Sequence, residues 1–102
     1  MATLYVTEYT KLGVGANGEA AVPQEPPVAE QVLPITGASA QSAPFNAATA
    51  FVRLHTDSPC SIEFGAAPVA TVFTARMAGN QTEYHGIPRG SGVFAVAVIS
   101  NI

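Results

Sequence analysis

The chain has 102 residues and a formal net charge of −3, and only 11% of its residues are charged, compared with about 25% in typical soluble domains. This length corresponds to a single domain, and the four basic residues are too scattered to form the positive stripe of a nucleic-acid-binding protein. No segment approaches the roughly 18 apolar residues of a membrane helix, so we expect neither nucleic acid nor a membrane as a partner. The low charge predicts neutral or apolar exposed surface of the kind found at interfaces.

The chain opens with a predicted strand over residues 3–9. Leu4 and Val6 alternate with Tyr5 and Tyr9, and β-branched and aromatic residues dominate the segment. Because this pattern starts without a basic stretch or an apolar run, we expect no signal peptide.

A tight hairpin is expected next. Residues 13–18 are rich in turn formers, and Asn17-Gly18 favours a type I′ turn, after which a second short strand is predicted near residues 20–22.

Four prolines then occur between Val22 and Pro34. They exclude a helix and predict an extended, polyproline-like arm, within which residues 32–36 could form an edge strand that tolerates Pro34. We therefore predict that residues 1–36 form a strand, a hairpin and an arm that contact other polypeptides. Deletion of residues 1–36 should then leave a folded core.

Two alternating segments predict the centre of the remaining domain. In residues 50–56, Val52 and Leu54 point inward, and in residues 60–64, Cys60 and Ile62 do so. The turn-forming segment 57–59 between them predicts that the two strands pair as an antiparallel hairpin.

The C-terminal part contains three further predicted strands. Residues 70–74 form a weak strand, residues 82–87 a strand with Tyr84 inward, and residues 93–99 a strand that is apolar on both faces. Such a strand lies centrally or has one side covered by a partner. The segments 76–81 and 88–92 are predicted to be a loop and a turn.

Short strands at this spacing, separated by glycine and proline, predict an all-β fold, a small antiparallel β-sandwich or jelly-roll-like barrel with an extended N-terminal arm. Residues 37–102 are expected to form the sandwich. Its predicted core residues are Val52, Leu54, Cys60, Ile62, Phe64, Tyr84, Val96 and Val98.

Catalytic, cofactor and metal sites are not predicted. His55 precedes Asp57 at a strand end and His85 follows Glu83, but there is no nucleophile elbow and no spacing typical of metal ligands. The single Cys60 has the parity of inward residues, so we expect a buried thiol and no internal disulfide.

The aromatic residues allow two interpretations. They could pack in the core or a subunit interface, or form a platform on which sugars stack, although the chain has no tryptophan. Tyr5 and Tyr9 share one face of the first strand. The residues expected at an interface are Tyr5, Tyr9, Pro23, Pro26, Pro27 and Val28.

Two stretches of the chain combine strand alternation with a proline turn and a glycine loop. They are FVRLHTDSPCSIEFG at 51–65 with PVAT at 68–71, and RMAGNQTEYHGI at 76–87 with VAVIS at 96–100. Together they resemble small β-rich virion structural proteins of tailed bacteriophages. The resemblance covers about residues 50–102, with a weaker match at residues 1–6, and its motifs concern strands and turns, not chemistry.

The resemblance implies a non-enzymatic capsid decoration or cement protein. It implies a homotrimer that clamps neighbouring major capsid subunits on the capsid surface, after synthesis in the host bacterial cytoplasm. The alternative is a receptor- or carbohydrate-binding module of a tail spike or fibre, which should display a concave aromatic patch.

Overall fold

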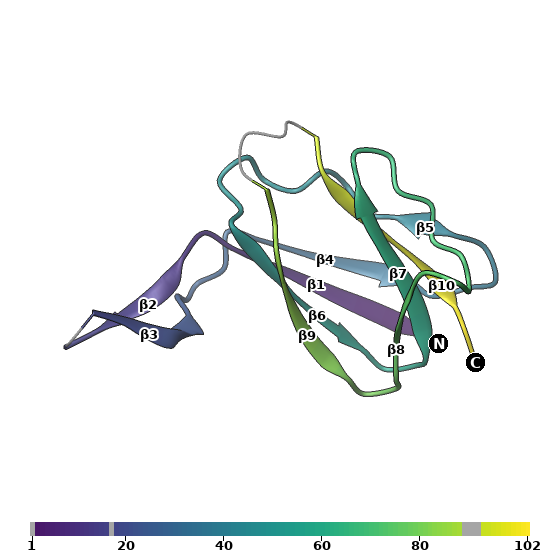
Figure 1. The fold of residues 1–102 in the computed structure, drawn as a ribbon, viewed down its shortest axis with the longest axis horizontal. Helices are drawn as coiled ribbons and strands as arrows, with labels where there is room; N and C mark the ends of the chain where they lie inside the picture. Colours follow the sequence, from purple (N-terminus) through teal and green to yellow (C-terminus); the bar gives the residue numbers. More distant parts are fainter. Residues whose placement is uncertain (1, 17, 89–92) are drawn as a thin grey trace.

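The computed structural model describes residues 2–16, 18–88 and 93–102. Within these ranges the chain is all-β (Figure 1). The strands are β1 (Thr3–Tyr9), β2 (Leu12–Gly15), β3 (Gly18–Pro23), β4 (Ala29–Pro34), β5 (Ala40–Gln41), β6 (Phe51–Thr56), β7 (Cys60–Gly65), β8 (Ala75–Met77), β9 (Thr82–Gly86) and β10 (Ala95–Ser100).

The strands form two four-stranded antiparallel sheets and a separate two-stranded one. The first sheet has the order β4-β1-β6-β9, the second has the order β5-β10-β7-β8, and β2 pairs with β3 alone. The two larger sheets pack against each other (Figure 1). This arrangement confirms the predicted small antiparallel β-sandwich.

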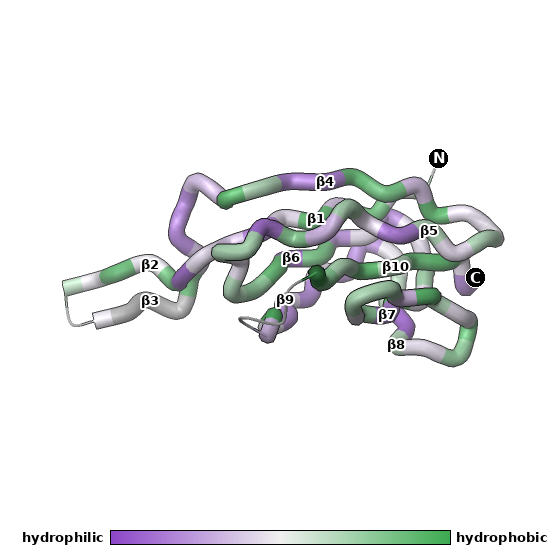
Figure 2. Tube along the Cα trace, turned by 90° about the horizontal axis from the view of Figure 1, so that it is seen from above, coloured by the Kyte–Doolittle hydropathy of each residue, from purple (hydrophilic) through white to green (hydrophobic). Residues whose placement is uncertain are grey.

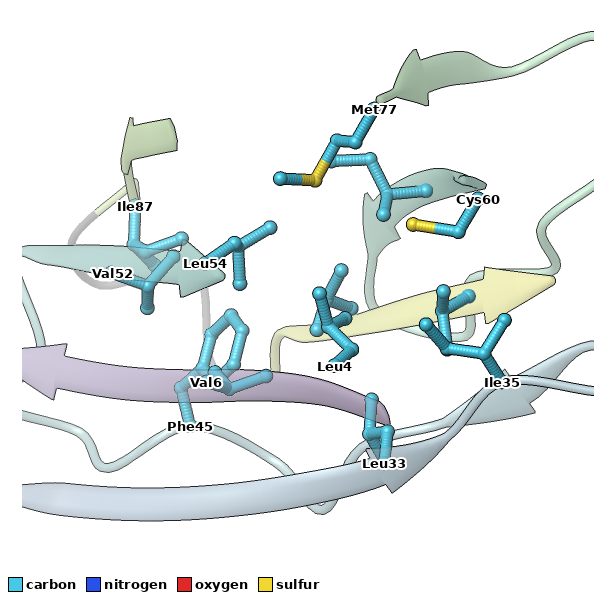
Figure 3. Packing of buried hydrophobic residues seen from close by; sticks show 13 residues of the cluster. Leu4, Val6, Leu33, Ile35, Phe45, Val52, Leu54, Cys60, Met77 and Ile87 are labelled. Carbon is cyan, nitrogen blue, oxygen red and sulfur yellow. The ribbon is translucent and has the colours of Figure 1, made fainter. Parts of the chain in front are cut away.

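The core lies between the two larger sheets. Alternate residues of β1 and β6 point inward, as their sequence pattern predicts, and they meet inward residues of β7 and β10. Figure 3 shows how these side chains interdigitate. The buried cluster consists of Leu4, Val6, Leu33, Ile35, Phe45, Val52, Leu54, Cys60, Ile62, Met77, Ile87, Val96 and Val98.

The N-terminal third of the chain is part of the sandwich, and the prediction that residues 37–102 complete it alone is wrong. Strand β1 lies between β4 and β6, where it pairs with both. Leu4 and Leu33 are buried in the core. Because residues 3–9 and 29–34 supply two of the four strands of the first sheet, deletion of residues 1–36 would open the core.

The connection between β1 and β4 projects from the sandwich. It contains the β2–β3 hairpin, which extends from one end of the molecule (Figure 1). The Cα radius of gyration is 13.8 Å, somewhat above the ~12.8 Å expected for a compact domain of this length. The predicted hairpin is confirmed by the pairing of Gly15 with Gly18, while Asn17 of the predicted type I′ turn lies outside the described residues.

The proline-rich segment forms no continuous arm. Its first residues end β3, its last residues form β4 at the edge of the first sheet, and a short loop with a cis Glu25–Pro26 peptide bond joins them. The prediction of an edge strand that tolerates Pro34 is confirmed, because β4 has β1 on one side only.

Strands β6 and β7 do not form the predicted hairpin. Both edges of β6 pair with other strands, β1 and β9, and β7 pairs with β8 and β10 in the second sheet. The chain crosses between the sheets at residues 57–59. The Thr56 hydroxyl donates to the carbonyl of Ser58 at 2.6 Å and the amide of Asp57 donates to the carbonyl of Thr3 at 3.2 Å, which fixes this bend.

Four other expectations require correction. Residues 71–74 form a turn in place of a strand, and the strand β8 overlaps the start of the segment 76–81 that was predicted as a loop. Tyr84 points outward, because it pairs with the outward-facing Arg53, and Phe64 is only partly buried. The turn predicted at 88–92 lies largely outside the described residues.

The prediction for the last strand is confirmed. Strand β10 lies between β5 and β7, and its residues from Ala95 to Val98 are all buried. In the part of the chain that the structure describes, there is no helix long and apolar enough to cross a membrane.

Candidate interaction surfaces

The outer face of the first sheet is rich in neutral and aromatic side chains. The strand register places Tyr5 and Tyr84 on this face, together with Phe51. The neighbouring edge strand adds Val32, which is 61% exposed. Single exposed apolar residues are common, but a sheet face that gathers them is typical of an interface.

An aromatic row crosses the first sheet at the hairpin end. The rings of Tyr9 and Phe51 are stacked with centroids 5.4 Å apart, and the centroid of Phe51 lies 6.4 Å from that of Tyr84. These side chains come from β1, β6 and β9, which are adjacent in space but distant in sequence. The sequence pattern therefore could not predict this row.

A groove lies where the hairpin meets this face, and we call it the hairpin groove. Its volume is about 420 Å³. Hydrophobic and aromatic residues dominate the described part of its lining. The lining residues are Leu12, Val22, Pro23, Phe51, Tyr84, His85 and Gly86.

The residues predicted to form an interface are not equally available. Tyr5 and Val28 are exposed, Pro26 is exposed and Pro27 is partly exposed. Tyr9, however, is only 4% exposed.

Tyr9 is instead an internal contact of the projecting connection. Its hydroxyl donates to Oε2 of Glu25 at 2.9 Å, and its ring stacks on Phe51. Burial, and next the bond to the Glu25 carboxylate, raise the pKa of Tyr9 to about 12. This side chain fixes the proline loop to the sheet and is not free to contact a partner.

The β7–β8 loop presents a second apolar surface, which the sequence interpretation missed. Phe73 is 94% exposed, and Val69 and Val72 are exposed beside it. Residues 65–74 contain no charged residue. Ten consecutive uncharged residues around a proline are the signal that could have indicated this surface, although the same residues also fit a turn followed by a weak strand.

The two histidines lie on opposite faces of the first sheet. His55 Nδ1 is 2.8 Å from the Thr82 hydroxyl on the outer face, and His85 Nε2 is 3.0 Å from Oε1 of Glu83 on the inner side. His85 also contacts the ring of Phe64. Among the described residues the structure thus places no serine nucleophile beside a histidine.

Two polar residues at and after the crossing between the sheets, Asp57 and Ser61, have structural roles. Oδ1 of Asp57 accepts from the amide of Thr3 at 2.7 Å, and the hydroxyl of Ser61 accepts from Asn101 at 2.8 Å. Each contact connects segments that are distant in sequence.

Cys60 is buried in the core as a free cysteine, which confirms its predicted inward parity. Burial raises the pKa of its thiol. No group of three or more potential metal ligands (His, Cys, Asp or Glu) occurs in the ranges that the structure describes.

Comparisons with known proteins add no relative. The chain matches no protein-family model, and searches of curated proteins and of solved structures found no match either.

Proposed function

We propose that this protein is a non-enzymatic structural protein of a tailed-bacteriophage virion, of the capsid decoration or cement type. The assignment to a virion is supported by the family resemblance of residues 50–102. The observation that supports docking is the half-face formed by β1 and β4, which we call the β1–β4 face and in which the exposed Glu30 is the one acidic residue of β4. Its exposed apolar residues are Tyr5, Val28 and Val32.

The β1–β4 face fits a role in binding another protein surface. Tyr5 is 46% exposed on a rigid central strand, so little side-chain entropy is lost when it packs against a partner. Glu30 is the one acidic residue of β4 and lies between Val28 and Val32, where it can set the register of the contact. A sheet face of this kind, with few charges, can lie across two neighbouring subunits.

In this proposal many copies cover the capsid surface after synthesis in the host bacterial cytoplasm. Each copy binds the major capsid protein and other copies of itself, as a homotrimer, without nucleic acid or membrane. Repeated weak contacts on one shell add up through multivalency, so each single contact needs only modest affinity.

The test is co-sedimentation of the purified chain with heads of the phage that encodes it. We expect the wild-type chain to pellet with heads and a Tyr5→Asp/Val32→Asp variant to stay in solution. Val14→Asp is the matched control, because it also places a carboxylate on an exposed apolar strand position, but on the projecting hairpin. A wild-type chain that fails to pellet with the heads would exclude the proposal.

The hairpin groove supports a second candidate function, that of a receptor- or carbohydrate-binding module of a tail spike or fibre. Phe51 and Tyr84 offer ring faces on which a sugar can stack, and the Tyr84 hydroxyl offers a hydrogen bond. A glycan array probed with the wild-type chain and with Tyr84→Ala tests this function. Binding that depends on Tyr84 would support it, and no binding to any glycan would remove it.

A further inference from the structure

We propose that the apolar tip of the β7–β8 loop, formed by Val69, Val72 and Phe73, inserts into the hairpin groove of a second copy of this chain. That copies of the chain associate with one another is part of the proposed function, on which this inference rests. The inference adds which residues make the contact. It does not involve the β1–β4 face, so the two surfaces can be tested separately.

The loop presents its tip in a fixed conformation. The amide of Ala70 donates to the Ser39 hydroxyl at 2.9 Å, and Asn101 donates to the carbonyl of Val72 at 3.1 Å. The Thr74 hydroxyl closes the turn by donating to the carbonyl of Thr71 at 2.8 Å. An exposed phenyl ring on an ordered loop is prepared for binding, because the loop loses little conformational freedom when it docks.

The exposure of this tip has no explanation within the chain. Phe73 is almost completely exposed, and Val69 and Val72 are 66% and 49% exposed. Large aromatic residues of this kind account for much of the binding energy of protein interfaces once a partner covers them. Figure 2 shows hydrophobic segments in this loop at the end of the molecule away from the hairpin.

The hairpin groove matches the tip in size and in chemistry. Its volume is about 420 Å³, and a cavity of roughly 150 Å³ is already large enough to hold a benzene molecule. The groove therefore has room for the ring of Phe73 and for one neighbouring valine. Among the residues that the structure describes, neither the tip nor the groove lining includes an Asp, Glu, Lys or Arg, so docking of these residues would bury no unpaired formal charge.

The arrangement excludes insertion within one copy and favours insertion between copies. The molecule is 45 Å long, and the β7–β8 loop and the hairpin lie in opposite halves of it (Figures 1 and 2). One chain thus carries an apolar projection in one half and a matching hollow in the other. A contact of this head-to-tail kind gives a closed ring if the rotation closes and an open chain if it does not.

Two substitutions separate the two halves of the contact. Phe73→Asp removes the inserted ring at a site where the side chain makes no buried contact. Gly86→Leu places a branched side chain in the groove, and the new Cβ atom has no heavy atom within 4 Å, so the backbone accepts the substitution without a clash at this atom. Val32→Ser is the control, because it removes an exposed apolar side chain that belongs to neither the tip nor the groove.

The experiment is sedimentation velocity of each full-length variant over a wide range of concentration. We expect the wild type and Val32→Ser to form oligomers whose mass is a multiple of 10.4 kDa. Phe73→Asp and Gly86→Leu should each weaken self-association at least about 30-fold, as loss of a hot-spot residue does. Thermal melts of the variants should match that of the wild type and so exclude unfolding.

Mixing the two defective variants gives the decisive measurement. Phe73→Asp keeps an intact groove and Gly86→Leu keeps an intact tip, so together they should form a one-to-one dimer although each alone is monomeric. If both variants still form oligomers, the proposed contact between the tip and the groove is refuted, whereas the proposal that the chain self-associates is retained. If the wild type is monomeric, both the contact and self-association are refuted. Co-sedimentation with heads would still test capsid binding independently.

Discussion

Oε1 of Glu8 accepts a hydrogen bond from the Thr49 hydroxyl at 2.7 Å, although the two residues are 41 positions apart. Both side chains are almost completely buried. The same oxygen accepts from the amide of Asn46 at 2.7 Å, and Oε2 accepts from the Gln31 side chain at 3.1 Å. One inward carboxylate on β1 therefore holds together the edge strand β4 and the loop that precedes β6.

Replacing Glu8 should destabilise the fold although the residue lies in no proposed interface. Glu8→Gln replaces one acceptor oxygen with a donor, which leaves a buried donor without a partner and costs about 1–3 kcal/mol in the free energy of unfolding. Urea denaturation measures this loss. The exposed Glu30→Gln is the control and should change the stability by less than about 0.5 kcal/mol. Equal stabilities of the two variants would contradict the role assigned to Glu8.

Two deletions should have opposite effects on folding. Replacing residues 12–23 with two glycines should leave a folded sandwich, because the amide of Gln24 already donates to the carbonyl of Lys11 at 3.1 Å. Deleting residues 1–36 should instead prevent folding, because it removes β1 and β4 with the core residues Leu4 and Leu33. Circular dichroism and thermal melting distinguish the outcomes, and a cooperative melt of the longer deletion would refute this assignment.

The hairpin deletion also bears on self-association. It removes Leu12, Val22 and Pro23 from the hairpin groove. We expect a folded monomer, which sedimentation velocity can detect. An oligomer as stable as that of the wild type would show that the groove wall on the hairpin side is not needed.

The Cys60 thiol should be unreactive in the folded protein. It is buried, and burial raises the pKa of the thiol, so the reactive thiolate is both rare and inaccessible. A disulfide reagent should label it only when the chain is unfolded in urea. Cys60→Ser should cost about 1–3 kcal/mol because it buries a poorly satisfied hydroxyl, and an unchanged melting temperature would contradict this prediction.

Tyr9 should make the protein less stable at high pH. Its pKa is about 12 in the folded chain and 10.0 in the absence of these contacts, so the folded state favours the protonated phenol. The stabilisation is complete below pH 10 and is lost as the pH rises from about 10 to about 12. The free energy of unfolding of Tyr9→Phe should lack this fall, and parallel pH profiles for the two proteins would argue against Tyr9 as its cause.

The sequence predicted features that depend on local alternation. The inward positions of Val52 and Leu54, the buried thiol of Cys60 and the edge strand with Pro34 are all confirmed. Each of these features depends on the two-residue period of a strand or on the missing amide hydrogen of proline. Both can be recognised within a short segment of the sequence.

Predictions of pairing were less successful. The segment 57–59 looks like a hairpin turn, but it carries the chain from the first sheet to the second. An aromatic residue on a strand is typical of a core, yet Tyr84 points outward because Glu83 and His85 take the inward positions of β9. Parity within a strand does not tell which of its two faces is buried, since the neighbouring strands decide that.

The candidate surfaces were predicted only in part. Tyr5 and Val28 are exposed as expected, whereas Tyr9 is occupied by Glu25 and Phe51. The hairpin groove joins residues from four strands, so no local pattern could indicate it. Phe73 belongs to an apolar segment whose exposure depends on how the rest of the loop is fixed.

By itself, the amino-acid order of this protein determined that it is a β protein with a projecting hairpin, because period-two alternation, turn formers and prolines act over a few residues. Only the tertiary structure decided that β1 and β4 complete the first sheet and that two apolar surfaces remain exposed. The reason is that burial depends on contacts between segments tens of residues apart, and those contacts are set by the packing of whole sheets.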